Sequence, residues 1–299
     1  MIRLKEISSE TLEWYYLEMK DKIDCSCLSE CSKKFLTEDI IKQILTKEPL
    51  VLLGIHNVAP CELKNKNIIE KVFDYDKFIS KSQSTSYEIS KKIGINTCTY
   101  CNRNYTLTIV EIDKKTGKEN NSTRISRPQF DHYFSQKDYP LLALSIYNLI
   151  PSCNICNSSI KGSKELSLKN HLHPYIEVGD NTNENFKFSY DFDETLSKFS
   201  VKINCEEKSK IKETLDFFKI KEVYNAHSNF ELKDLYDLRY KYSQNYLDIL
   251  CNKTFEGLNL SQEEAYRMVF GIEVNKDDYH KRPFSKFKHD IIEELKKSF

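Results

Sequence analysis

The chain has 299 residues, of which 39% are hydrophobic and 30% charged, and its 45 basic and 45 acidic side chains balance. This composition is typical of a folded globular protein and excludes a disordered chain. The longest apolar runs, Pro49 to Ile55 and Leu141 to Ile150, are far shorter than the roughly 20 residues of a membrane span. The N-terminus shows no secretion signal. We therefore expect a cytoplasmic protein that does not associate with a membrane.

The first ninety residues are expected to be helical. Apolar periodicity favours helices over residues 10–20, 38–45, 68–79 and 86–93. We expect the last of these to begin with a capping box, Thr85-x-x-Glu88, and to end at Gly94. We assign residues 1–93 to a helical N-terminal region.

The central segment, residues 94–177, is expected to contain two strands and a short helix. Residues 105–112 and 124–130 are rich in β-prone residues and are separated by a polar turn, which predicts a β-hairpin. Asp131-His132 then lies at or just beyond the second strand. Residues 138–151 are expected to form a packed connection, and a short helix is expected from Cys156 to about Lys164.

The remaining residues, 178–299, are expected to form a second hairpin and more helices. Phe186, Phe188 and Tyr190 alternate, as do Phe199, Val201 and Ile203. The apolar face of a long helix is then expected at Leu235, Leu238, Tyr242, Tyr246 and Ile249. A capping box at Ser261-x-x-Glu264 opens a helix that ends at Gly271, and a last helix begins near Phe284. The fold class is therefore α+β.

Two Cys-x-x-Cys pairs bracket the central segment, Cys98 with Cys101 and Cys153 with Cys156. Two intervening residues let a turn direct both sulfurs of a pair at one ion, so four thiolates predict a closed structural zinc site. Tyr100 and Tyr105 are expected to pack beside it. The looser cluster of Cys25, Cys27 and Cys31 is left without a role.

The residues between and beside the pairs are suited to phosphodiester hydrolysis. A histidine such as His132 can act as a general base near neutral pH. Asp131 and the amide oxygen of Asn157 offer oxygen ligands for a hard divalent ion, Mg²⁺ or Mn²⁺, which would polarise the phosphate. Neighbouring residues in a strand point to opposite sides, so one can hold the ion while the other faces the water.

These motifs resemble the HNH, or ββα-metal, endonuclease family. The resemblance is carried by the two cysteine pairs, by Phe130-Asp131-His132, by Tyr147 to Cys153, and by Cys156-Asn157-x-x-Ile160-Lys161-Gly162. It implies a central ββα-metal domain with His132 as general base and with Asp131 and Asn157 as metal ligands. It also implies that Asn148 hydrogen-bonds across the loop and orients the base. Many family members have histidine where this chain has Asn157, so the metal preference is open.

Within this family, the sequence of the motif most resembles the PtuB-type HNH effectors of Septu and retron-associated anti-phage systems. Those effectors act beside an ATPase subunit, PtuA, which implies an ATPase partner here. We expect the substrate to be DNA, with RNA as the open alternative. Residues 91–169 carry twelve Lys or Arg against six Asp or Glu, so this segment is basic within a neutral chain. Arg103, Lys137 and Lys161 are the candidates to contact phosphate.

Two other functions stay open on the sequence. A zinc knuckle is often only structural or a binding module, in which case the chain is a nucleic-acid-binding or adaptor protein and Asp131-His132 is incidental. A second alternative keeps the nuclease but makes it a free-standing restriction or mobile-element enzyme without an ATPase.

Overall fold

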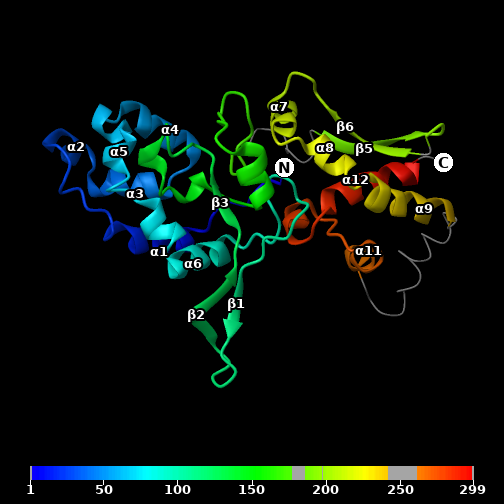
Figure 1. Ribbon diagram of the computed structural model, residues 1–299, viewed down its shortest axis with the longest axis horizontal. Coiled ribbons are helices and arrows are strands. Elements are labelled where there is room, and N and C mark those ends of the chain that lie inside the picture. Colours follow the sequence, from blue (N-terminus) through cyan, green and yellow to red (C-terminus); the bar gives the residue numbers. More distant parts are fainter. Residues whose placement is uncertain (1, 177–185, 197, 242–260, 298–299) are drawn as a thin grey trace.

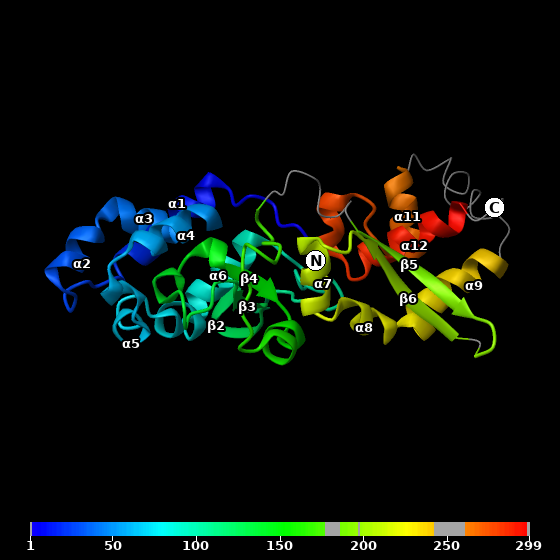
Figure 2. The same cartoon turned by 90° about the horizontal axis from the view of Figure 1, so that it is seen from above.

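The computed structural model describes residues 2–176, 186–196, 198–241 and 261–297. The chain is elongated, with the N-terminal helices at one end, the C-terminal hairpin and helices at the other, and the cysteine-bearing segment between them (Figure 2). Helices and small sheets both occur, which confirms the α+β class. No helix in these ranges is long and apolar enough to cross a bilayer.

The N-terminal region is helical, as expected, but its helices differ in detail. It contains α1 (Ser9–Lys20), α2 (Glu30–Phe35), α3 (Glu38–Thr46), α4 (Pro49–Val58), α5 (Lys66–Ile69), the π-helical turn η2 (Asp76–Ser80) and α6 (Gln83–Ile93). The helix expected over 68–79 is wrong, because the chain leaves α5 at Ile69 and turns through Asp74, whose carboxylate accepts the Lys77 N–H.

Helix α6 begins one turn earlier than expected. Ser82, not Thr85, is its N-cap, and the Ser82 hydroxyl accepts the Thr85 N–H. Gly94 ends the helix in the left-handed conformation at φ 68°, as the sequence predicted, because glycine meets no Cβ clash there. The helix delivers the chain to the first cysteine pair four residues later.

The central strands pair differently from the expected hairpin. β1 (Ile109–Ile112) and β2 (Glu119–Ser126) do form a hairpin, which projects from the body of the protein (Figure 1). Asp131 and His132, however, lie in a separate strand, β3 (Gln129–His132), which pairs antiparallel with β4 (Leu149–Ser152). Pro128 separates β2 from β3, since proline has no N–H to donate to a ladder. The expected packed connection therefore ends in a strand.

The C-terminal expectations are largely confirmed in the described residues. β5 (Phe186–Asp193) pairs antiparallel with β6 (Lys198–Cys205). The helical elements that follow are α7 (Lys210–Phe217), α8 (Ile220–Asn225), η6 (Ser228–Leu232), α9 (Lys233–Lys241), α11 (Gln262–Phe270), η9 (Lys276–Lys281) and α12 (Ser285–Lys297). The capping box at Ser261 and the left-handed Gly271 are both present. The second half of the long helix expected around 235–249 lies outside the described residues.

The central segment is tied to both flanking regions. The Tyr15 hydroxyl of α1 donates to the Leu144 carbonyl, and the Tyr224 hydroxyl of α8 donates to the Cys101 carbonyl. One connected core of buried apolar side chains runs through all three regions. The domain boundaries at 93/94 and 177/178 stay predictions.

Candidate metal centre and active site

The four paired cysteines converge in the folded chain. Their sulfur atoms all lie within 4.8 Å of one another, and all four residues are buried. A tetrahedral shell with Zn–S bonds of about 2.3 Å spaces its sulfurs about 3.8 Å apart. The four residues therefore fit a structural metal such as zinc. They are the only such group of three or more ligand side chains in the part of the chain that the structure describes. Cys25, Cys27 and Cys31 are not part of a comparable cluster.

Each pair sits in a turn that directs backbone N–H groups at sulfur. The Arg103 N–H points to Cys101 Sγ, and the Cys156 N–H points to Cys153 Sγ, both at 3.5 Å. Asn102 closes the first turn in a left-handed conformation at φ 48°, and its N–H donates to the Cys98 carbonyl. Asparagine tolerates this conformation better than most residues. N–H groups directed at sulfur favour the thiolate form that binds metal.

The sulfurs influence one another's protonation. Burial raises the pKa of the Cys98 thiol, whereas side-chain hydrogen bonds from Cys101 and Cys156 lower the pKa of Cys153. Without a cation, thiols this close together can hydrogen-bond to one another through their protons. A bound cation would take the place of those protons. Zinc would bind the deprotonated forms, so metal binding would release protons and stabilise the fold.

A strand pair and a helix lie next to the cysteines. β3 and β4 are paired so that Asp131 is opposite Ile150 and His132 is opposite Leu149. The chain then passes Cys153 and enters η5 (Ile155–Lys161), a π-helical turn that packs against β3. The expected short helix is therefore present. The order is strand, strand and helix, although the pairing partner of β3 is β4 rather than the expected hairpin strand.

Asn148 connects the two ends of the loop between β3 and β4. Its Oδ1 accepts the Phe134 N–H at 2.7 Å, and its Nδ2 donates to the carbonyls of Phe134 and Leu142, both at 3.0 Å. The residue is completely buried. Removing its side chain would leave the Phe134 N–H and carbonyl without partners, whereas the Leu142 carbonyl would keep the Ser145 N–H. Asn148 therefore fixes the loop that packs over His132.

His132 has a defined tautomer in this loop. Its Nε2 lies 2.9 Å from the Ala143 carbonyl oxygen, and since that oxygen can only accept, Nε2 carries the proton. Nδ1 is then the acceptor, and the Gln136 amide nitrogen lies 3.2 Å from Nδ1 and 3.1 Å from Nε2. Burial lowers the pKa of His132 to about 4. The ring is therefore neutral at pH 7, as a general base must be, but it is a weak base in this closed conformation.

The ring of His132 is covered by residues that the sequence did not single out. The edge of Tyr75, just before η2, meets the ring at a centroid distance of 4.4 Å, and Gln136 covers both nitrogens. A cleft of about 430 Å³ lies on the other side of this cover. Tyr75, Gln136 and Ala143 line it, together with charged side chains between Lys66 and Lys81 and with Phe73 and Pro140. His132 is only 9% exposed. The cover therefore separates the ring from this cleft.

Asp131 points to the opposite side of β3. Its Oδ1 accepts from Lys161 Nζ at 2.7 Å and its Oδ2 from the Tyr100 hydroxyl at 2.5 Å. Lys161 Nζ also donates to the His132 carbonyl at 3.0 Å. Asp131 is 2% exposed, and both of its oxygens are occupied. The pair therefore does not fit a hydrated divalent ion in this conformation, because a lysine ammonium stands at the carboxylate.

Asn157 lies on η5 and faces β3. Its Nδ2 donates to Gln129 Oε1 at 3.0 Å, and Asn157 is half-buried. Gln129 and Asp131 are two residues apart in the strand and face the same helix, where their partners are Asn157 and Lys161 respectively. Asp131 and Asn157 thus lie along one interface, while His132 lies on the other face of β3.

The three cations expected at phosphate are placed differently from one another. Lys161 is buried in its ion pair with Asp131, so it does not face solvent in this conformation, and its contact with phosphate stays a prediction. Arg103 is half-buried, and its Nη1 lies 3.2 Å from His227 Nε2. Lys137 is exposed to solvent beside the loop of His132. Of the tyrosines expected to pack beside the cysteines, Tyr100 is buried and Tyr105 is 55% exposed.

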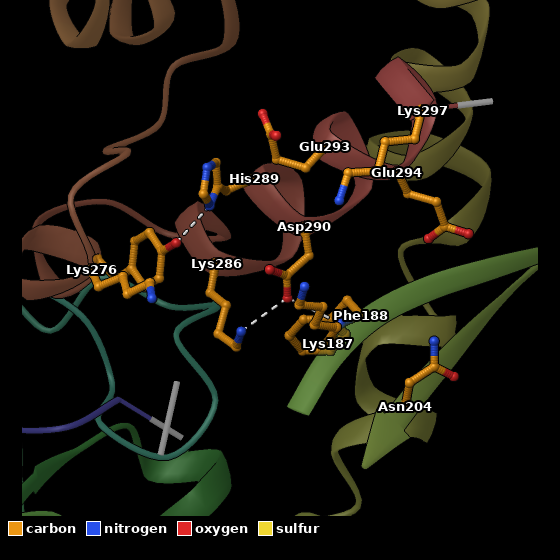
Figure 3. A pocket seen from close by; sticks show the side chains of 11 residues that line it. Lys187, Phe188, Asn204, Lys276, Lys286, His289, Asp290, Glu293, Glu294 and Lys297 are labelled. Carbon is orange, nitrogen blue, oxygen red and sulfur yellow. Dashed lines mark hydrogen bonds and ion pairs between the residues drawn. The ribbon is translucent and has the colours of Figure 1, made fainter. Parts of the chain in front are cut away.

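A second cleft lies in the C-terminal region, away from the cysteines. It has a volume of about 600 Å³ and is lined by β5, β6 and α12, with four lysines and three carboxylates (Figure 3). Lys286 pairs with Asp290 at 3.0 Å, and the Tyr279 hydroxyl lies 2.6 Å from His289 Nδ1. Because charges of both signs alternate around it, the cleft does not select for an anion, and we assign it no role in the site.

No protein-family model matches the chain, and neither the curated proteins nor the solved structures contain a match to it. The resemblance to HNH nucleases therefore rests on the motif residues alone.

Proposed function

We propose that the chain is an HNH-type endonuclease that hydrolyses phosphodiester bonds in DNA. The observation that supports this best is the arrangement around β3. His132 lies on the first strand of a strand, strand and helix unit, with its proton on Nε2. Nδ1 is the nitrogen that would accept from a water once Gln136 moves away from it. The cysteine cluster holds the far end of the same unit.

The chemistry that the residues support begins at His132. Nδ1 would take a proton from the attacking water while the Ala143 carbonyl keeps Nε2–H in place. Asn148 keeps that carbonyl positioned by tying residues 134 and 142 together. A rise in the pKa of His132 would accompany opening of the Tyr75 and Gln136 cover, because contact with water favours the charged form of the ring.

The need for Mg²⁺ or Mn²⁺ is part of this proposal and comes from the family resemblance. Asp131 can serve such an ion only after Lys161 has moved away, so the conformation described here is a closed one. The resemblance of the motif sequence also suggests a role for the chain in bacterial anti-phage defence, as an effector that acts beside an ATPase partner. A partner that opens the site would explain why the free chain is closed.

The same closed geometry favours a second candidate, a non-catalytic zinc-knuckle protein. In that case the Asp131–Lys161 pair and the covered His132 are permanent parts of the core. A free-standing restriction or mobile-element nuclease has no observation in its favour here.

Nicking of supercoiled plasmid DNA separates these candidates. Wild type and His132→Ala are compared with Mg²⁺ or Mn²⁺, with and without proteins that copurify, at equal zinc content. We expect wild type to nick the plasmid and His132→Ala to lose the activity. Equal activity of the two proteins, or no nicking under any of these conditions, would reject the nuclease.

A further inference from the structure

The hairpin β1–β2 has no role in the proposed chemistry, yet it is the most prominent projection of the molecule. Figure 1 shows it extending from the body beside α6. An isolated two-stranded hairpin is marginal in water, so a projecting ribbon that contributes little to the core calls for another explanation.

The tip of the ribbon is a folded turn that presents lysines. Asp113 accepts the N–H groups of Lys115 and Thr116 at 2.7 and 3.0 Å, and Gly117 adopts φ 65°. The only carboxylate of the 113–118 turn is thus directed at backbone N–H groups. Lys114, Lys115 and Lys118 are all exposed. The tip therefore presents three ammonium groups to solvent.

Exposed apolar side chains lie along the ribbon. Ile112, just behind the tip, is 51% exposed, and Ile109 and Ile125, toward the base, are 42% and 63% exposed. Exposed lysines alone need no explanation beyond contact with solvent, and exposed isoleucines alone would suggest that a protein partner covers them. The combination of a cationic tip and apolar flanks is the chemistry of a ribbon that enters a DNA groove, where lysines meet phosphate and apolar side chains contact or wedge between bases.

The ribbon is attached to the body at both ends and leads directly to the candidate site. Near its tip, Lys91 of α6 forms an ion pair with Glu119, which lies opposite Ile112. Arg127 at the end of β2 donates to the Pro128 carbonyl at 2.7 Å and lies over the Phe130 ring. Two residues later, β3 begins, and this strand carries His132. A duplex held by the ribbon is thereby placed at the segment that holds the candidate base.

We propose that the β1–β2 hairpin binds duplex DNA, with Lys114, Lys115 and Lys118 on the phosphates and Ile112 and Ile125 in the groove. A groove about 12 Å wide admits a two-stranded ribbon. The occupant is DNA rather than a protein because the tip presents three cations and its own carboxylate is turned inward. Of the two glutamates beside the tip, Glu119 is paired with Lys91, which leaves Glu111 as the exposed carboxylate next to the three lysines. This inference rests on the proposed function, since the bound DNA would be the substrate of the candidate site.

The test measures binding without cutting. A labelled DNA duplex is titrated with full-length His132→Ala protein at several salt concentrations, and fluorescence anisotropy gives the affinity. The ribbon variant carries Lys114→Ala, Lys115→Ala and Lys118→Ala. The control carries Lys34→Ala, Lys47→Ala and Lys208→Ala, which are equally exposed lysines outside the ribbon. Zinc content and thermal unfolding verify that both variants are folded.

We expect the ribbon variant to bind more weakly and its dependence of log affinity on log salt to be shallower by about 2.7, since each lost phosphate contact removes about 0.9. The control variant should match the parent. Ile112→Ser should weaken binding without changing the salt slope. Equal affinities and slopes for the ribbon variant and the parent would overturn the proposal and leave the isoleucines as a protein-docking surface.

The binding experiment and the nicking assay test the ribbon and the nuclease separately. DNA binding through the ribbon without any nicking would reject the nuclease and keep the ribbon. Nicking that is unaffected in the ribbon variant would reject the ribbon and keep the nuclease.

Discussion

Replacement of Lys161 by methionine probes the least expected contact of the site. Methionine keeps an unbranched side chain of similar length and removes the charge. The side chains of Lys161 and Asp131 are 6% and 3% exposed, and the Nζ to Oδ1 distance is 2.7 Å. Without the ammonium, the buried carboxylate keeps only the Tyr100 hydroxyl. Loss of one partner of a buried ion pair costs about 3–5 kcal/mol, because the other charge stays buried without compensation.

We expect Lys161→Met to lower the free energy of unfolding by that amount in urea denaturation followed by circular dichroism at fixed free zinc. The double variant with Asp131→Asn should recover most of the loss, because no unpaired charge remains. Lys212→Met is a matched control, since Lys212 and Asp216 form an exposed pair, and it should cost less than about 1 kcal/mol. A similarly small loss for Lys161→Met would refute the buried pair.

Three further changes test other parts of the site. Asn148→Ala should destabilise the chain by roughly 3 kcal/mol in urea, because the buried N–H and carbonyl of Phe134 lose their partner. A loss below about 1 kcal/mol would mean that the loop is held by other contacts. The pKa of His132 is lowered to about 4, and the unfolded value is about 6.5, so the unfolded state binds more protons between these values. The free energy of unfolding should therefore fall as the pH drops from about 6.5 to about 4, by at most about 1.4 kcal/mol per pH unit from this residue. His132→Gln should flatten this dependence on pH. The same pH dependence in both proteins would contradict the lowered pKa of His132. Tyr75→Ala should speed the reaction of His132 with diethyl pyrocarbonate, followed by peptide mass spectrometry, and an unchanged rate would show that Tyr75 does not cover the ring.

Local signals in the sequence predicted the elements whose ends are set by single residues. Gly94 and Gly271 end helices in the left-handed conformation, and Ser261 with Glu264 forms the capping box that its spacing indicated. The convergence of the four cysteines also followed from spacing, because each pair is a local turn with one chemical use. For the caps and for each cysteine pair, the interaction lies within a few residues and can be predicted from the local sequence. The two pairs are about fifty residues apart, and their meeting was predicted from the chemistry of a shared metal.

Contacts between distant residues could not be predicted in the same way. β4 lies inside an apolar run whose periodicity does not separate a buried strand from a packed loop, and only its pairing with β3 defines it. The cover over His132 joins it to Tyr75, 57 residues away, and the Asp131–Lys161 pair spans 30 residues. Lys161 looked like a surface cation because its partner is specified by the packing of η5 on β3, which no local pattern records.

The centre on which the whole account depends is the cysteine cluster, and its metal content is the most direct test. Elemental analysis of the purified chain by mass spectrometry should find one zinc per chain. Cys153→Ser should lose the metal together with the cooperative unfolding transition, because a structural zinc contributes directly to the free energy of folding. A fully folded chain that contains no metal, either as wild type or as Cys153→Ser, would contradict the account.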